Sequence, residues 1–392
     1  ISVGPHDFHE SSWGTGSFAL NDFLSWSDMM AHQGRGTLHR LGFQFRSARR
    51  LAGAVADVPL GAAGRSLLGE RSRWYESWIE HPDADDPFWD SMRMNHALDN
   101  CGVPVLLLSG WQDIFIDQTI TQYRHLRDRG MDVAMTVGPW THDQMVTKAT
   151  GATAAETLQW LGSHLAGSQN VPRREQPVRV FVTGARNGWV DLPDWPPATA
   201  PHTFYLQPYR RLGVSVPPAR TPASTFRYDP ADPTPTVGGR LLTRNSGYTE
   251  DTALARRTDV LTFTGAPLTE EICVCGNPVL ELDYASDNPH FDVFFRISEV
   301  DARGRSRNVS DGYRRFSAHP DAPIRLELDP VAHRFGKGSR IRVLVGGGSH
   351  PRFARNMGTG EPAITGRSMR PSVHTVRYGE SSRLTLPSGE PR

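Results

Sequence analysis

The sequence predicts an α/β sheet followed by an all-β domain. Alternating strand and helix patterns fill residues 103–167, as is typical of an open parallel sheet. Short alternating runs separated by Gly, Pro, Asp and Asn dominate after residue 178 and indicate a β-sandwich or jelly roll. The 37 glycines and 30 prolines among 392 residues favour many turns and disfavour a helical bundle.

The first part of the chain, over residues 17–97, has a mainly helical pattern. One amphipathic stretch runs over 18–30 and another over 74–79. His81-Pro82 ends the second stretch, because the residue before a proline leaves the α region. This periodicity is typical both of a helical cap over a site and of a plain helical subdomain, and it does not separate the two.

The α/β pattern begins with the apolar run Val103–Ser109, which predicts a parallel strand covered on both faces. Apolar residues at helical spacing over Ile116–Leu126 predict a helix, and Gly130 suits its C-terminal cap. Val133–Val137 predicts a second buried strand, and Leu158–Leu165 predicts a further amphipathic helix.

The polar segment 169–177 contains a proline and is typical of a linker. After it, short alternating runs predict the following strands: Val178–Val182, Thr203–Leu206, Val260–Phe263, Val279–Leu282, Asp292–Val300, Ile324–Leu328 and Arg340–Val345.

Charge and composition exclude several classes of partner. Lys+Arg 43 against Asp+Glu 42 gives a net charge of +1, so no basic field exists to hold nucleic acid or an anionic membrane. No apolar run approaches the roughly 18 residues of a membrane span. The three cysteines and the His6–Glu10 cluster lack the spacing of a closed zinc site, so we expect no metal site.

Two loops hold residues suited to catalysis. Asp113 follows the first predicted strand and His142 follows the second, so both lie where the carboxyl ends of parallel strands meet. The chain between them is long enough for one helix and one returning strand, so a bond from Asp113 to one ring nitrogen of His142 is feasible. The alternative is that Asp113 is a turn residue and His142 is structural.

Tryptophans near these loops are candidates for the substrate pocket. Trp111 and Trp140 flank the two loops, and Trp26 lies in the helical region. Core packing is the alternative for each of these indole rings.

The sequence resembles a known family at this point. Gly110–Phe115 followed by Gly138–His142 resembles the paired acid and histidine motifs of the CocE/NonD hydrolases, which include cocaine esterase and the S15-type X-Pro dipeptidyl-peptidases. Trp74–Trp89 resembles the end of that family's cap. Further segments of this chain resemble motifs of that family's C-terminal domain: Phe181–Pro197, Asp229–Pro235, Ala285–Asp287, Asp311–Gly312, Ala332–Phe335 and Ser349–Phe353. The resemblance spans about Gly14 to Leu386.

The resemblance implies the C-terminal portion of an α/β-hydrolase domain with a helical cap, followed by a jelly-roll, galactose-binding-like β-sandwich. The corresponding expected divisions are a hydrolase-domain remnant at 1–16, the cap at 17–98, the C-terminal hydrolase portion at 99–168, a linker at 169–177 and the sandwich at 178–392.

The resemblance also implies a serine hydrolase that cleaves an ester or amide through a Ser-His-Asp triad, with Asp113 and His142 as two of its members and with no metal or organic cofactor needed. No Gly-x-Ser-x-Gly pentapeptide occurs here, and Gly64–Gly69 has one residue too many. We therefore expect the serine upstream of Ile1, in a truncated or clipped polypeptide, and little activity from the chain as it stands. The alternative is a non-catalytic binding or scaffold protein.

The implied substrate is a small-molecule ester or a peptide-like molecule. X-Pro peptides, aryl esters and acylated β-lactam precursors lie within the family's range, and no residue selects among them. A homo-oligomer stays open. The compartment is unknown; cytoplasmic is the default, and any export signal is expected among residues that precede Ile1.

Overall fold

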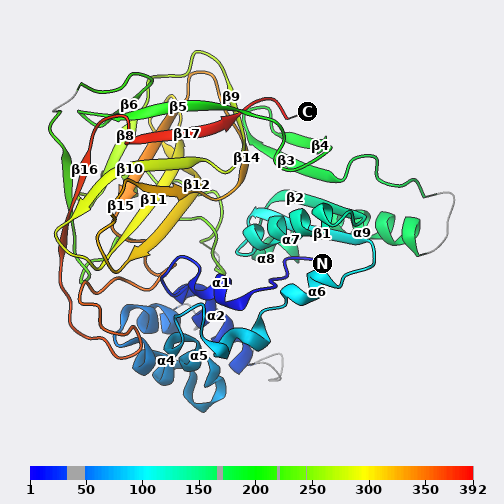
Figure 1. Ribbon diagram of the computed structural model, residues 1–392, viewed down its shortest axis with the longest axis horizontal. Helices are drawn as coiled ribbons and strands as arrows, with labels where there is room; N and C mark the ends of the chain where they lie inside the picture. Colours follow the sequence, from blue (N-terminus) through cyan, green and yellow to red (C-terminus); the bar gives the residue numbers. More distant parts are fainter. Residues whose placement is uncertain (33–48, 166–170, 219–220, 244, 392) are drawn as a thin grey trace.

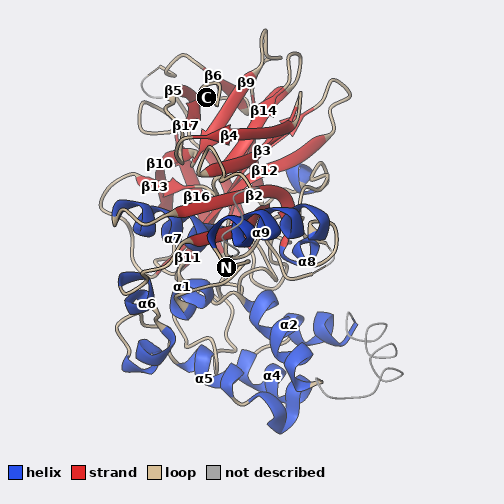
Figure 2. Cartoon of the chain, turned by 90° about the vertical axis from the view of Figure 1, so that its right-hand side faces the viewer, coloured by secondary structure: helices blue, strands red, loops and turns tan. Residues whose placement is uncertain are grey.

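The chain forms a helical region, a short parallel sheet with its helices, and a large β-sandwich (Figure 1). The computed structural model describes residues 1–392 apart from 33–48, 166–170, 219–220, 244 and 392. Figure 2 shows helices α2, α4 and α5 at one end of the molecule and the strands of the sandwich at the other. The predicted fold class is confirmed.

The helical region packs around aromatic side chains. Phe18 and Trp89 are fully buried in its core, and the ring centroids of Phe23 and Trp78 are 4.8 Å apart. Part of the expected cap, 33–48, lies outside the described residues. The described helices are α1 (Phe8–Trp13), α2 (Leu20–Ala31), a helical segment at 49–56, α4 (Leu60–Leu68), η1 (Gly69–Ser72), α5 (Trp74–Glu80), η2 (Pro87–Met92) and α6 (Asn95–Asp99).

The parallel sheet is built as its sequence pattern predicts. Its first elements are β1 (Val105–Gln112), α7 (Ile116–Asp128), β2 (Val133–Thr141), α8 (His142–Met145) and α9 (Thr150–His164). Strands β1 and β2 pair in parallel, with Val105 opposite Val133. Alternate residues of β1 pack on one face against α7 and on the other against Trp140 and Met145, so both faces are covered.

Two strands assigned to the sandwich belong to this sheet instead. The sandwich was expected to begin at residue 178, but β3 (Val178–Gly184) pairs in parallel with β2, and β4 (Gly188–Leu192) pairs antiparallel with β3. The inward side chains of β3 pack in the core of the parallel sheet, beside Trp111 and Trp195. An alternating strand pattern does not specify which sheet a strand joins. Strand β3 also pairs with β14 of the sandwich, so the expected division at residue 178 stays a prediction.

The segment expected to be a linker makes a contact with the parallel sheet, and helix α9 exposes apolar side chains. Residues 169–170 of the linker lie outside the described part, but Arg174 is anchored, since it donates to Thr136 Oγ1 at 2.8 Å. Helix α9 forms, yet Leu158 and Leu165 are 71% and 78% exposed, so these leucines do not face a core among the described residues.

The sandwich consists of two packed sheets. Strands β12, β11, β15 and β8 pair in that order in one layer, while β13, β10, β17 and β5 pair in the other. The bounds are β5 (Ala200–Gln207), β6 (Arg211–Gly213), β7 (Ser224–Tyr228), η3 (Leu254–Arg256), β8 (Val260–Thr264), β9 (Ile272–Gly276), β10 (Val279–Ser286), β11 (Phe291–Val300), β12 (Ser306–Phe316), β13 (Ile324–Glu327), β14 (Val331–Phe335), β15 (Arg340–Gly346), β16 (Ser372–Arg377) and β17 (Arg383–Ser388).

The core of the sandwich lies between these layers and contains side chains such as Phe263, Leu282 and Phe295, all 0% exposed. Every predicted strand run in this region is confirmed. Strand β14 also pairs with β3 at His333 and Thr183, which connects the sandwich to the parallel sheet. Among the described residues, no helix combines the length and apolar character needed to cross a membrane.

The core predicts a clear difference between two leucines. Leu282→Ala removes a side chain that is 0% exposed and leaves a cavity, so we expect the free energy of unfolding to fall by about 2–5 kcal/mol. Leu158→Ala changes a side chain that is 71% exposed and should alter it by about 0.5 kcal/mol or less. Urea unfolding followed by circular dichroism measures both, and equal losses would contradict this description of the core.

Candidate active site

Asp113 is a buried carboxylate at the end of β1. Its side chain is 0% exposed, and its backbone N–H donates to Gly110 O at 2.9 Å. Its Oδ1 accepts a hydrogen bond of 2.7 Å from the backbone N–H of Phe115, directly before α7 begins. One carboxylate oxygen is therefore fixed by the backbone, and the other is free to bind a partner.

That partner is His142, the first residue of α8. Its Nδ1 lies 2.8 Å from Asp113 Oδ2. Asp113 is an acceptor when ionised, so Nδ1 carries the proton and donates it, and the lone pair of the neutral imidazole is on Nε2. The side chain of His142 is 25% exposed, and we find no hydrogen-bond partner for Nε2 among the described residues.

The two residues meet because β1 and β2 approach each other closely at their carboxyl ends. Gly110 lies opposite Gly138 in the parallel pair. A Cβ at Gly110 would lie 2.2 Å from Trp140 O, and one at Gly138 would lie 2.4 Å from the Trp140 ring. Both positions therefore require glycine. After β2, the backbone N–H of Thr141 donates to Gln144 Oε1 at 3.4 Å, in the first turn of α8.

The electrostatic surroundings of His142 favour its charged form. Burial alone would lower its pKa, but the hydrogen bond to Asp113 and the charges of Asp113, Asp143 and Asp22 raise it, and the net effect is a pKa above the ordinary 6.5. The pair therefore contributes stability that is fully present below pH 6.5. This contribution is lost as the pH rises through the pKa of folded His142.

Asp22 was missed by sequence reasoning. It lies in α2, far from the strand-end motifs, and its Oδ1 accepts hydrogen bonds from Leu242 N at 2.8 Å and Asn21 Nδ2 at 2.9 Å. Burial raises its pKa, against the opposing effect of these bonds and of the charges of Arg352 and His142. No short motif marks this residue, because helix packing brings it near His142.

The candidate pocket tryptophans have different surroundings. Trp111 is 0% exposed and donates from Nε1 to Phe181 O at 2.8 Å, within the core of the sheet. Trp140 is 8% exposed and lies near Trp189, while Trp26 is half-buried beside Trp74. These contacts are those of packing residues, and the pocket assignment stays a prediction. The ring of Phe115, by contrast, contacts the His142 ring edge-on at 5.5 Å.

The His6–Glu10 cluster has local hydrogen-bond partners. His6 Nδ1 lies 3.2 Å from Gln122 Nε2, His9 Nε2 lies 3.1 Å from Pro82 O, and Asp7 caps α1 by accepting from Glu10 N at 2.9 Å. Within the described ranges, no group of three or more His, Cys, Asp or Glu side chains has an arrangement that could hold a metal ion.

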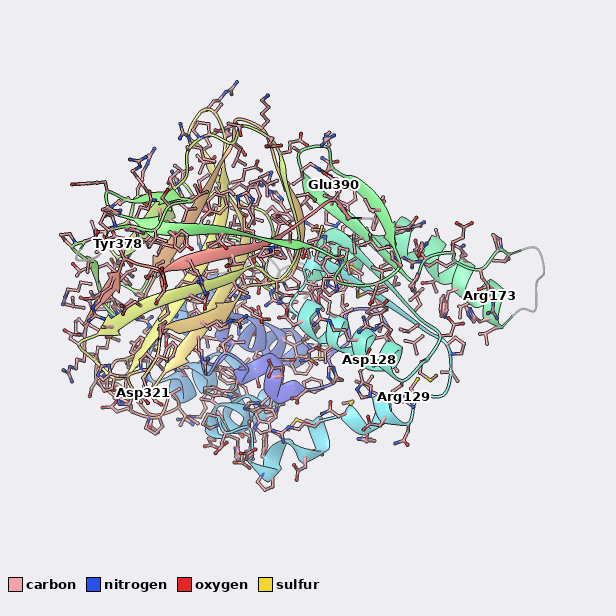
Figure 3. All side chains as sticks on the ribbon, turned by 45° about the horizontal axis from the view of Figure 1, so that its top comes forward. Asp128, Arg129, Arg173, Asp321, Tyr378 and Glu390 are labelled. Carbon is pink, nitrogen blue, oxygen red and sulfur yellow. The ribbon has the colours of Figure 1, made fainter. Side chains whose placement is uncertain are left out.

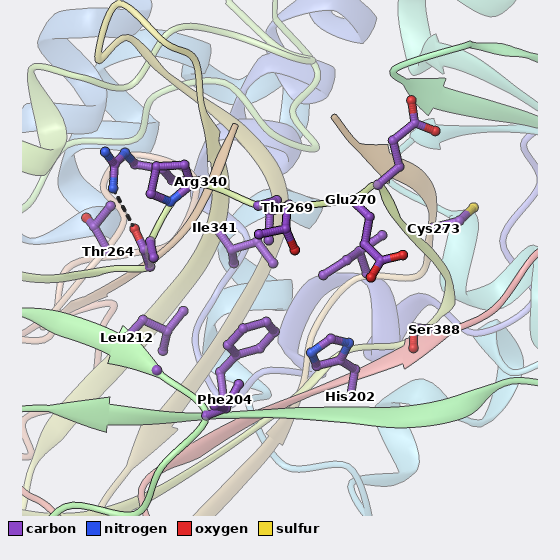
Figure 4. A pocket seen from close by; sticks show the side chains of 18 of the residues that line it. His202, Phe204, Leu212, Thr264, Thr269, Glu270, Cys273, Arg340, Ile341 and Ser388 are labelled. Atoms are coloured by element: carbon purple, nitrogen blue, oxygen red, sulfur yellow. Dashed lines mark hydrogen bonds between the residues drawn. The ribbon is translucent and has the colours of Figure 1, made fainter. Parts of the chain in front are cut away.

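A separate cavity of about 870 Å³ lies in the sandwich, and neither Asp113 nor His142 lines it. Its lining combines the rings of His202 and Phe204 with Leu212, Glu270 and Arg340, and Figure 4 shows these side chains around the opening. The two rings stack with centroids 4.7 Å apart. This cavity and the acid–histidine pair are therefore different sites.

The fold is that of the C-terminal portion of an α/β-hydrolase domain followed by a β-sandwich. Residues 1–144 match the family model of X-Pro dipeptidyl-peptidase (S15 family), and residues 169–385 match that of the X-Pro dipeptidyl-peptidase C-terminal non-catalytic domain. The chain belongs to this family of serine hydrolases, the CocE/NonD group, so the resemblance seen in the sequence is confirmed.

Individual relatives agree with this membership. Cocaine esterase of Rhodococcus sp. (strain MB1 Bresler) is 28% identical over 347 residues, which cover 79% of this chain and 59% of that protein. An aminopeptidase from a Thaumarchaeota archaeon superposes with a TM-score of 0.79 at 23% identity, covering 99% of this chain and 72% of its own. An α-amino acid ester hydrolase gives 0.76 at 21% identity, with the same coverages. At these identities, the two structures show a shared fold.

The bond between Asp113 and His142 predicts a measurable pKa. In the chain as it stands, we expect His142 to titrate above 6.5, and Asp113→Asn to lower its pKa because the charge and the charge-assisted hydrogen bond are lost. Asp128→Asn is the control, since this carboxylate is 66% exposed at the far end of α7. NMR titration of the histidine ring protons, assigned with a His142→Gln variant, measures both. An unchanged pKa in Asp113→Asn would contradict the described pair.

Proposed function

We propose that this polypeptide is part of an enzyme that hydrolyses an ester or amide through a Ser-His-Asp triad, with Asp113 and His142 as acid and base. The observation that carries the proposal is the 2.8 Å contact between His142 Nδ1 and Asp113 Oδ2 at the ends of consecutive parallel strands. In α/β-hydrolases the triad follows the chain order Ser, Asp or Glu, His, and these two residues occur in that order.

The serine of this triad is proposed to lie upstream of Ile1. The printed sequence has no Gly-x-Ser-x-Gly segment, and the chain spans 59% of the length of the cocaine esterase that it matches. Residues 1–3 also pair with β1: the Ile1 ammonium donates to Leu106 O at 2.7 Å and Val3 N to Leu108 O at 3.0 Å. The sheet thus has a further parallel partner beside β1.

In the proposed reaction, His142 Nε2 accepts the proton of the serine hydroxyl as its oxygen attacks the carbonyl carbon. Asp113 holds the imidazole in the tautomer that leaves Nε2 free, and it stabilises the imidazolium that forms. His142 then protonates the leaving alcohol or amine, and water attacks the acyl-enzyme by the same route in reverse. These steps need no further group, and the chain as it stands is expected to lack activity.

The proposed substrates are small esters or peptide-like molecules with an acyl carbon open to attack. Relatives carry the names cocaine esterase, aminopeptidase and α-amino acid ester hydrolase, and each name describes cleavage at a carbonyl carbon. These names include both ester and peptide substrates. Whether the proposed enzyme is an esterase, an acylase or an X-Pro dipeptidyl-peptidase is therefore a question for substrate assays.

A second candidate function is non-catalytic binding by the sandwich. The cavity of about 870 Å³ favours it, because a hollow lined by aromatic, aliphatic and charged side chains is typical of ligand sites. The DNA upstream of Ile1 separates the two functions. A Gly-x-Ser-x-Gly segment in the same reading frame supports the hydrolase, whereas a start codon with no such segment supports binding alone.

Labelling with a serine-directed fluorophosphonate tests the proposed enzyme. The upstream-extended polypeptide should be labelled, and His142→Ala should slow labelling by about 10³-fold or more, because the serine loses its base. The chain as it stands should take up no label. His96→Ala is the matched control, since this histidine is exposed on α6 and should leave the rate unchanged. Undiminished labelling of His142→Ala would overturn the triad assignment.

A further inference from the structure

A segment of the sandwich reaches the elements that surround the Asp113–His142 pair. Arg240 Nη1 lies 2.5 Å from Asp117 Oδ2, in the first turn of α7. Leu242 N donates to Asp22 in α2, and a Cβ at Gly247 would lie 3.0 Å from the Thr141 side chain, directly before His142. The sandwich therefore contacts three elements near the candidate site, namely α7, α2 and the end of β2.

Arg240 is the charged link in this segment. Its side chain is only 11% exposed, and it pairs with Asp117 in the α/β part and with Asp329 in the sandwich. Its Nε is buried and has no hydrogen-bond partner among the described residues. Arg240 has an unsatisfied donor and its partner Asp117 is 54% exposed, so the pair is a weak source of net stability. The consequence of this contact is thus geometric, because it fixes where α7 begins.

On the sandwich side, Asp329, the partner of Arg240, belongs to a network of buried ion pairs. Arg352 Nη1 lies 3.3 Å from Asp311, and Arg296 Nε, on a side chain that is 0% exposed, lies 2.7 Å from the same carboxylate. Arg352 also approaches Asp329 at 3.8 Å. Arg240 is therefore the last member of an alternating series of buried charges that extends from strands β11 and β12 to α7.

The opposite end of α7 is anchored within the α/β part. Arg129 Nη1 donates to Cys101 O at 3.1 Å, on the segment that leads into β1. Figure 3 shows Asp128 and Arg129 at this end of the helix. Among the described residues, the ion pair at the N-terminal end of α7, next to Asp113, reaches the sandwich segment between β7 and β8, whereas Arg127 near the other end pairs with Asp194, directly before Trp195.

The first turn of α7 is coupled directly to Asp113. Phe115 N–H holds Asp113 Oδ1 at 2.7 Å, and Phe115 O accepts from Thr119 N at 2.9 Å inside the helix. A shift of the first turn therefore moves Phe115, and with it the carboxylate that holds His142. The contact between Arg240 and Asp117 opposes such a shift.

We infer that Arg240 is a positioning residue that aligns Asp113 with His142 from the sandwich. The domain whose family model is named non-catalytic would then set the geometry of the catalytic pair. The role in catalysis rests on the proposed function. The alignment itself is a property of this chain and can be measured without any hydrolase activity.

The test is the pKa of His142 in Arg240→Met, measured by NMR titration of the chain as it stands. Removing a nearby positive charge would by itself raise this pKa, whereas loosening the bond to Asp113 lowers it. The sign thus separates alignment from a direct charge effect. We expect a fall of about half a pH unit or more. An unchanged or raised pKa in the folded variant would overturn the inference.

Further variants keep the test decisive. Arg227→Met is the matched control, because Arg227 is 60% exposed and pairs with Asp229 within the sandwich; it should leave the pKa of His142 unchanged. Arg240→Gln serves if Arg240→Met fails to fold, because it also removes the positive charge and the ion pair. Asp117→Asn breaks the same contact, but the loss of its negative charge itself lowers the pKa of His142, so it is used only in a double-variant cycle with Arg240→Met. The double variant should lower the pKa no more than the larger single effect, because both changes break one contact. Additive falls would contradict a shared contact.

Failure of this inference and failure of the proposed function give different results. If the extended polypeptide is not labelled by fluorophosphonate, the proposed function fails, but the pKa of His142 in Arg240→Met still shows whether Arg240 aligns Asp113 with His142. If it is labelled, Arg240→Met should reduce kcat about tenfold with KM within about twofold, since alignment of the base acts on the chemical step. Arg240→Lys should recover part of kcat, because it restores the charge opposite Asp117. An unchanged kcat would overturn the positioning role in catalysis.

Discussion

The arrangement of the candidate site depends on the close parallel approach of β1 and β2 at their carboxyl ends. A side chain on Gly110 would collide with the Trp140 backbone on the neighbouring strand, so this glycine allows the two strands to end side by side, while Gly138 leaves room for the Trp140 ring on its own strand. Asp113 and His142 then leave neighbouring strand ends at a separation that one hydrogen bond can span. Without this approach, an acid and an imidazole on adjacent loops would be two unrelated surface groups.

The sequence allowed the parallel elements and the contact between Asp113 and His142 to be predicted because both depend on local patterns. Apolar runs of strand length marked β1 and β2, and the residues after each strand were suited to catalysis. The assignment of β3 and β4 could not be made in this way. Val178, Val180 and Val182 alternate as sandwich strands do, and only their packing against the parallel sheet determines which sheet they extend.

Residues brought to the site by tertiary packing were outside the reach of sequence patterns. Asp22 lies in a helix, and Arg240 lies in a loop between strands of another domain, so neither occurs at a fixed spacing from Asp113 or His142. Arg240 contacts Asp117 in the first turn of α7, which begins beside Asp113, and Asp22 lies close enough to His142 for a negative charge there to raise the pKa of its ring. Their roles follow from distances in space, which no periodicity of the chain encodes.

The pKa of His142 connects these contacts to chemistry. A carboxylate that binds Nδ1 strengthens Nε2 as a base, but the same interaction favours the protonated ring, so the base form becomes dominant only above pH 6.5. Asp22 and Asp143 act in the same direction, whereas burial opposes them. The site therefore balances base strength against the fraction of unprotonated imidazole. A fixed position of Asp113 matters for both properties. If the hydrogen bond between Asp113 Oδ2 and His142 Nδ1 were looser, His142 would be a weaker base and its ring would be less well oriented.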